Sequence, residues 1–274
     1  MSNLEKKHDF LLFIDSDGTI MNTMNDKHIN CFGPIFIKVF EIKSHVEEIL
    51  IHWNNTNLYT QSRGMNRFQG LREIVLFTKQ FGYEFEGFDE YLSWLDEAME
   101  LSNEAIEKEI DSHPHNPFFK KALDWSIEVN KSISELPPSN YFNNIPEILN
   151  KLSSVCDLIA VSAANKEAIN EAFDRLNLKK YFQKIYTQED GDKADIISKV
   201  ISGGYNKKNC MIIGDSMSDY KAGLDNEIYF YPIIPGHEIE SWIRLDDALH
   251  RLLEHKIDEV YQLDLIDDFY QNLK

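Results

Sequence analysis

Short, continuous runs of apolar residues recur along the chain and predict strands that are buried on both faces. These runs are Phe10–Ile14, Leu158–Ser162, Cys210–Gly214 and Ile228–Pro232. Continuous rather than alternating hydrophobicity is typical of parallel sheets, which helices cover on both sides. Helical patterns lie between the later runs, over Asn165–Leu176, Lys193–Ile201 and Ser218–Leu224. Strands that alternate with helices of this length predict an α/β fold with a doubly wound, Rossmann-like parallel sheet.

The long segment between the first and second apolar runs has a different pattern, with amphipathic stretches and no buried-strand run. The stretches expected to be helical are Glu41–Asn54, Gly70–Phe81, Phe88–Ile110 and Phe118–Leu136. Trp94 and Trp125 fall at helical positions, where packing in a core is the default interpretation. We therefore expect a core domain of residues 1–23 and 141–274, with a helical domain of residues 24–140 inserted after the first strand. Two further helices are expected within Ile239–Lys274.

The composition and the charge narrow the class of protein. Of the 274 residues, 43% are hydrophobic and 12% aromatic, which is enough to bury a sizeable core and excludes a disordered chain. The 28 basic residues against 46 acidic ones give a net charge of −18. That charge opposes binding to nucleic acid or to an anionic membrane surface. A small phosphorylated substrate stays possible, because local groups or a bound cation can reverse the field within one pocket.

The cysteines and the absence of long apolar stretches indicate the compartment. Cys31, Cys156 and Cys210 lack the paired spacing of a disulfide framework or a zinc site, and we expect buried free thiols beside the apolar runs. No stretch approaches the roughly 18 apolar residues that a membrane span needs. The sequence therefore predicts a soluble protein of a reducing, cytoplasmic compartment. Its oligomeric state is not indicated.

Four carboxylates are expected to converge at one edge of the predicted sheet. Asp15 and Asp17 follow the first strand, and residues two apart in an extended chain point to the same side. Asp215 follows the Cys210–Gly214 strand, and Asp219 falls on the opening turn of the next helix. Open α/β sheets bind ligands at the carboxyl ends of their strands. Because clustered carboxylates repel and are costly to desolvate, we expect these four to hold a hard divalent cation, Mg²⁺ when a phosphate is bound as well.

Two more polar residues fit the same site. Ser162 ends a strand, where its hydroxyl can hold a phosphoryl oxygen, and Lys193 opens a helix, where its ammonium can stabilise transferred negative charge. Each residue also has an ordinary interpretation by itself. Asp17 followed by Gly18 is typical of a turn. Taken alone, Ser162 is typical of a helix cap, and Lys193 is typical of a solvated surface. Their joint occurrence at successive strand ends favours a single site.

In this order the residues resemble the motifs of the haloacid dehalogenase-like (HAD) hydrolase superfamily. The four motifs are matched by Asp15–Thr19 (DxDGT), Ser162, Lys193 and Gly214–Asp219 (GDxxxD). The resemblance implies that Asp15 is the nucleophile, that Asp17 is the general acid and base, and that Ser162 and Lys193 bind phosphoryl oxygens. It also implies that Asp15, the backbone carbonyl of Asp17 and Asp215 hold Mg²⁺, with Asp219 close by. The inserted helical domain would be a cap of the family's first type.

The resemblance further implies a Mg²⁺-dependent phosphatase that hydrolyses a small phosphorylated metabolite through an aspartyl-phosphate intermediate. Asp17 favours this reaction, because members that cleave carbon–halogen or carbon–phosphorus bonds generally lack a second aspartate. Two alternatives stay open: a phosphomutase of the β-phosphoglucomutase type and a catalytically idle regulatory protein that binds metal or phosphate. Arg63 and Arg67, in a loop expected between cap helices, are candidates for substrate recognition, with solvated loop arginines as the alternative.

Overall fold

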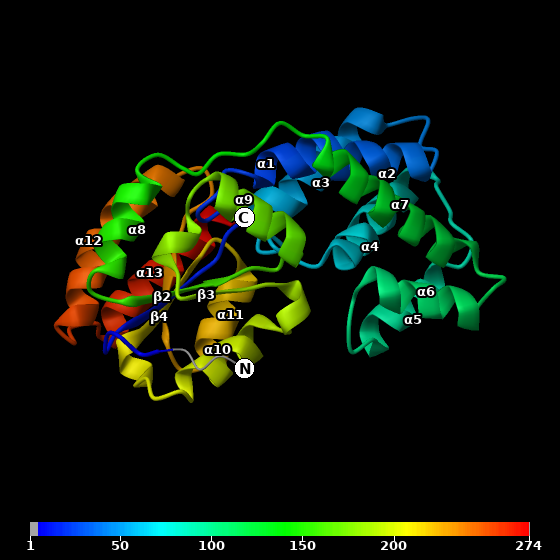
Figure 1. The fold of residues 1–274 in the computed structure, drawn as a ribbon. Coiled ribbons are helices and arrows are strands. Elements are labelled where there is room, and N and C mark those ends of the chain that lie inside the picture. Colours follow the sequence, from blue (N-terminus) through cyan, green and yellow to red (C-terminus); the bar gives the residue numbers. More distant parts are fainter. Residues whose placement is uncertain (1–4, 274) are drawn as a thin grey trace. The chain divides into compact units, whose positions relative to one another are not determined.

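The computed structural model describes residues 5–273, and the chain divides into two compact units (Figure 1). The core unit consists of Met1–Met24 and Pro138–Lys274, and the helical unit of Asn25–Pro137. The sequence analysis placed these boundaries after residues 23 and 140. The two connections between the units leave the core unit side by side, since Met21 and Tyr141 form an antiparallel bridge. Each unit has its own hydrophobic core and is described by itself.

The core unit is built on a parallel sheet of five strands in the order β3-β2-β1-β4-β5 (Figure 1). The strands are β1 (Leu11–Ile14), β2 (Asp157–Val161), β3 (Lys184–Tyr186), β4 (Cys210–Gly214) and β5 (Tyr229–Pro232). The four predicted strands are therefore confirmed. The edge strand β3 was not predicted, because it has three residues and only Tyr186 is buried, so it forms no apolar run.

Helices cover both faces of this sheet, as the continuous hydrophobicity of the strands predicts. They are α8 (Ile145–Ser153), α9 (Lys166–Arg175), α10 (Lys193–Ile201), α11 (Met217–Asp225), α12 (Glu238–Leu253) and α13 (Glu259–Asn272), with short 3₁₀ turns η3 (Lys179–Tyr181), η4 (Gln188–Asp190) and η5 (Lys207–Asn209). Successive strand residues point to opposite faces. Leu12 and Ile14 pack with α8, α9 and α12, whereas Leu11 and Phe13 pack with α10, α11 and α13. The sheet is therefore doubly wound, and the predicted fold class is confirmed.

The helical unit contains only helices and turns among its described residues. They are α1 (Met24–Lys27), the π-helical turn η1 (His28–Phe32), α2 (Gly33–Val39), α3 (Val46–Tyr59), α4 (Arg67–Thr78), η2 (Lys79–Phe81), α5 (Phe88–Glu97), α6 (Asn103–Ser112) and α7 (Pro117–Ser134). Aromatic side chains dominate its core, where Trp94 and Trp125 are buried as predicted.

Two of the predicted helices have the wrong bounds. The range Glu41–Asn54 begins in the turn between α2 and α3, where Glu41 and His45 adopt positive φ angles of 55° and 56°, and the helix itself starts at Val46. The range Phe88–Ile110 is interrupted after α5, and Ser102 begins the next helix by accepting a hydrogen bond from the backbone of Ala105. Hydrophobic spacing continues across both breaks because the two helices on either side pack on one core.

The remaining sequence expectations concern cysteines and membrane segments. All three cysteines are free and buried, which confirms the prediction made for Cys156 and Cys210 beside the apolar runs. Within residues 5–273, every helix is too short or too polar to cross a lipid bilayer.

The burial of two leucines of the core unit predicts that replacing them changes the free energy of unfolding by very different amounts. Leu158 in β2 is 1% exposed and Leu224 in α11 is 60% exposed. We expect Leu158→Ala to lower the free energy of unfolding by about 2–5 kcal/mol, because it removes transfer energy and leaves a cavity. The matched control Leu224→Ala should change it by less than about 0.5 kcal/mol. Urea unfolding followed by circular dichroism measures both, and equal losses would contradict the described burial.

Candidate active site

Three carboxylates meet at the carboxyl ends of two neighbouring strands. Asp15 follows β1, Asp215 follows β4, and Asp219 lies in the first turn of α11. One oxygen from each lies within 4.8 Å of the others, and the three residues are at most 6% exposed. We call these three residues the carboxylate cluster. The pairing of β1 with β4 brings the carboxylate cluster together. The backbone of Asp15 extends this pairing, because its N–H donates to the carbonyl of Ile213 at 3.0 Å.

Lys193 bridges two members of the carboxylate cluster. It is the first residue of α10, and its Nζ lies 2.6 Å from Asp15 Oδ1 and 2.6 Å from Asp219 Oδ1. Burial opposes the charged form, but attraction and hydrogen bonds from the two carboxylates outweigh it and raise the pKa of Lys193 above its usual value. The ammonium therefore keeps its charge inside the site.

One ammonium does not balance three buried carboxylates. Burial raises the pKa of Asp15 well above its usual value; the charge of Lys193 lowers it, and those of Asp219 and Asp215 raise it further. With all groups ionised, the carboxylate cluster and Lys193 together carry a net charge of −2. A hard divalent cation takes oxygen ligands and offsets that charge. Asp15, Asp215 and Asp219 therefore fit a Mg²⁺ ion by charge, by donor type and by mutual distance.

Ser216 and Gly214 hold Asp219 in place. The backbone N–H and the hydroxyl of Ser216 donate to Asp219 Oδ2 at 3.2 and 2.6 Å. The Asp219 N–H donates back to Ser216 Oγ at 3.4 Å, which completes a capping box at the start of α11. A Cβ atom at Gly214 would lie 2.3 Å from the carboxyl carbon of Asp219, so a side chain there would displace the carboxylate. The sequence analysis missed Ser216, although the spacing Ser-x-x-Asp is a capping-box pattern that identifies it.

Thr19 holds Asp215 in place. Its buried hydroxyl donates to Asp215 Oδ1 at 2.9 Å, and its backbone carbonyl accepts from Trp242 Nε1 at 2.8 Å. Thr19 belongs to the matched DxDGT motif, so the motif itself pointed to it. Nothing in the sequence pattern pointed to Trp242, which lies 223 residues further along the chain.

The structure places Asp17 and Ser162 beside the carboxylate cluster rather than in it. The Asp17 carboxylate is not one of the three clustered groups, and its Oδ1 accepts a hydrogen bond from Thr23 at 2.5 Å. Ser162 follows β2, and its Oγ lies 2.7 Å from Ser16 Oγ and accepts from the backbone of Ala164 at 3.1 Å. Of the four carboxylates expected to converge, the structure therefore brings together three, without that of Asp17. A metal contact through the Asp17 backbone carbonyl stays a prediction, as does phosphate binding by Ser162.

Arg63 and Arg67 both have partners within the helical unit. Arg63 is buried and donates to the carbonyl of Leu58 at 2.9 Å. Arg67 begins α4, so its expected place in a loop is wrong, and its Nη1 donates to Ser126 Oγ at 3.1 Å and Asn130 Oδ1 at 2.7 Å. Both side chains therefore stabilise the helical unit, and their role in substrate recognition stays a prediction.

The capping box at α11 predicts a specific effect of Ser216→Ala. The variant should lose about 0.5–2 kcal/mol of unfolding free energy, as N-cap substitutions do. It should also reduce the rise in melting temperature on adding Mg²⁺, because Asp219 loses its hydroxyl donor. Ser102→Ala is the matched control, since Ser102 caps α6 in the helical unit. Thermal unfolding with and without MgCl₂ measures both variants, and equal Mg²⁺ responses would contradict the role of Ser216.

Comparisons with known proteins identify the family of the chain. The family model described as haloacid dehalogenase-like hydrolase matches residues 73–232, a range that includes Ser162, Lys193 and Asp215–Asp219. A search of curated proteins finds no match.

Among solved structures, a hydrolase from Pseudomonas syringae is 12% identical with a TM-score of 0.51, and the match covers 86% of this chain and 89% of that one. A structure described as a predicted phosphoglycolate phosphatase from Haemophilus somnus is 14% identical with a TM-score of 0.52, covering 82% of this chain and 86% of that one. At these identities the two structures show a shared fold. The family model matches more than half of the chain, and this protein therefore belongs to the haloacid dehalogenase-like hydrolase family.

Proposed function

We propose that the protein is a Mg²⁺-dependent phosphatase that hydrolyses a small phosphomonoester through an aspartyl-phosphate intermediate. The observation that supports this most is the buried carboxylate cluster bridged by Lys193, which combines a nucleophilic carboxylate with binding groups for a cation. Phosphoryl transfer depends mainly on positioning and on neutralisation of charge, and this arrangement serves both needs.

In the proposed reaction the nucleophile is Asp15. Its carboxylate oxygen attacks phosphorus and forms the aspartyl-phosphate, while the bond between phosphorus and the leaving oxygen breaks. Asp17 gives its proton to that oxygen. Water then attacks the same phosphorus and gives a proton to Asp17, and the bond to Asp15 breaks to release inorganic phosphate. Lys193 orients Asp15 through its 2.6 Å contact with Oδ1.

The residues that would hold the cation are Asp15, Asp215 and Asp219. When bound, Mg²⁺ supplies positive charge that offsets the negative charge of the transferred phosphoryl group. Thr19 and Ser216 keep two of these carboxylates in place before any ligand arrives. Such preorganisation lowers the cost of reorganisation during the reaction.

We further propose that the helical unit selects the substrate. Arg67 forms no ion pair with a carboxylate among residues 5–273, so an anionic group of a substrate would not have to displace one. Arg63 is the second candidate. A phosphomutase would use the same core residues and differ in returning the phosphoryl group to a bound sugar instead of water.

The proposal predicts metal-dependent hydrolysis of a generic aryl phosphate. Purified protein should release p-nitrophenol from p-nitrophenyl phosphate with MgCl₂ and lose that activity in EDTA. Asp15→Asn should abolish turnover, because an amide is a poor nucleophile. Equal turnover of the wild type in EDTA and in Mg²⁺ would contradict the proposal. Binding of Mg²⁺ without hydrolysis of any ester in a broad panel would instead favour a regulatory protein.

Replacing Asp17 should slow hydrolysis by an amount that depends on the leaving group, whereas replacing Asp15 should not. Asp17→Asn should slow hydrolysis of alkyl phosphates by roughly 10²–10⁴-fold, the range of general acid–base catalysis. The loss should shrink for aryl esters whose leaving groups need no protonation. Asp15→Asn serves as the control, since it should be inactive with every ester. Steady-state rates over a series of leaving groups measure the effect, and a loss independent of the leaving group would remove Asp17 from the acid role.

A further inference from the structure

We infer that Trp242 is a positioning residue for the carboxylate cluster and acts through Thr19 on Asp215. The inference rests on the proposed function, because it treats this cluster as the site of the bound cation. Trp242 lies outside the four matched motifs, on helix α12 near the end of the chain.

The first link is a hydrogen bond between two buried groups. Trp242 is 2% exposed and Thr19 is fully buried, and the indole Nε1 donates to the Thr19 carbonyl at 2.8 Å. A buried carbonyl without a partner is costly, so this donor stabilises one orientation of the peptide after Thr19. Helix α12 therefore fixes the backbone of the loop that follows β1.

The second link runs from the same residue to the carboxylate cluster. Thr19 sits in a tight turn, in which Ile20 donates to the carbonyl of Ser16 at 2.9 Å and Gly18 donates to that of Met21 at 2.8 Å. From this turn the Thr19 hydroxyl donates to Asp215 Oδ1 at 2.9 Å. A shift of the Thr19 backbone would move that hydroxyl, and Asp215 would lose a donor that sets its orientation.

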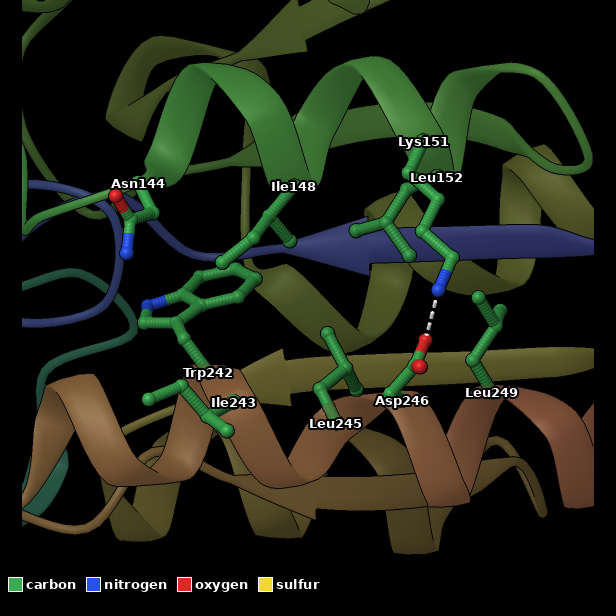
Figure 2. A pocket seen from close by; sticks show the side chains of 9 residues that line it. All are labelled: Asn144, Ile148, Lys151, Leu152, Trp242, Ile243, Leu245, Asp246 and Leu249. Atoms are coloured by element: carbon green, nitrogen blue, oxygen red, sulfur yellow. Dashed lines mark hydrogen bonds and ion pairs between the residues drawn. The ribbon is translucent and has the colours of Figure 1, made fainter.

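The indole packs in the hydrophobic core between α8 and α12. Figure 2 shows a hollow between α8 and α12, in which the Trp242 ring lies against Ile148 and its nitrogen points away from the ion pair of Lys151 with Asp246. The hollow has a volume of about 220 Å³. The ring is 2% exposed, so packing and the hydrogen bond to Thr19 together set its orientation.

The test is Trp242→Phe, which keeps an aromatic ring and removes the N–H donor. Calorimetric titration with Mg²⁺ alone should give a dissociation constant raised by about 2- to 13-fold, the range that one net hydrogen bond implies. Tyr231→Phe is the matched control. Its hydroxyl also donates to a buried carbonyl of α12, that of Ser241 at 2.7 Å, but it is not linked to Thr19. We expect both variants to lose similar stability and only Trp242→Phe to weaken Mg²⁺ binding.

A double-mutant cycle tests the route through Thr19. Thr19→Val removes the hydroxyl donor to Asp215, so adding Trp242→Phe to it should weaken Mg²⁺ binding no further. Additive losses, or Trp242→Phe binding Mg²⁺ as tightly as the wild type, would overturn the inference. If Trp242→Phe does not fold, Trp242→Met replaces it with another apolar side chain without a donor. A wild type that binds Mg²⁺ but hydrolyses no ester would contradict the proposed function alone, and one that binds no Mg²⁺ would overturn the inference as well.

Discussion

Repulsion among three buried carboxylates is the constraint on which the core unit depends. Asp15, Asp215 and Asp219 are nearly inaccessible to water, and the charges of Asp219 and Asp215 lie close enough to disfavour the charged form of Asp15. Lys193 offsets part of this charge through two contacts of 2.6 Å, and serine and threonine hydroxyls hold the carboxylates at fixed positions. The remaining negative charge is what makes the site suited to a divalent cation.

The parallel sheet makes this arrangement possible. β1 lies at the centre of the sheet between β2 and β4, so residues that follow three neighbouring strands meet at one edge. Asp15, Ser162 and Asp215 come from chain segments far apart in the sequence but occupy adjacent strand ends. The strands themselves are apolar and covered on both faces, which leaves polar chemistry confined to the loops at this edge.

The helical unit has a separate physical basis. Its core consists largely of stacked and edge-on aromatic rings, among which Trp53, Phe118 and Trp125 are essentially inaccessible. Arg67 lies over the ring of Phe32 at 5.3 Å and hydrogen-bonds to α7, so this cation belongs to the packing of the unit as well as to any recognition role. The helical unit is therefore held together by its own packing, independently of the carboxylates of the core unit.

Local pattern by itself determined the fold class, four of the five strands and the acidic turns that follow two of them, because buried strands and such turns have strong signatures. The local pattern did not predict β3, because its three residues form no apolar run. It also did not predict the breaks before α3 and after α5, because hydrophobic spacing continues across both turns. Only the tertiary structure decided which carboxylates cluster and what holds them. The contact of Trp242 with Thr19 joins residues 223 positions apart, and no local spacing records a hydrogen bond that exists only once α12 packs on the sheet.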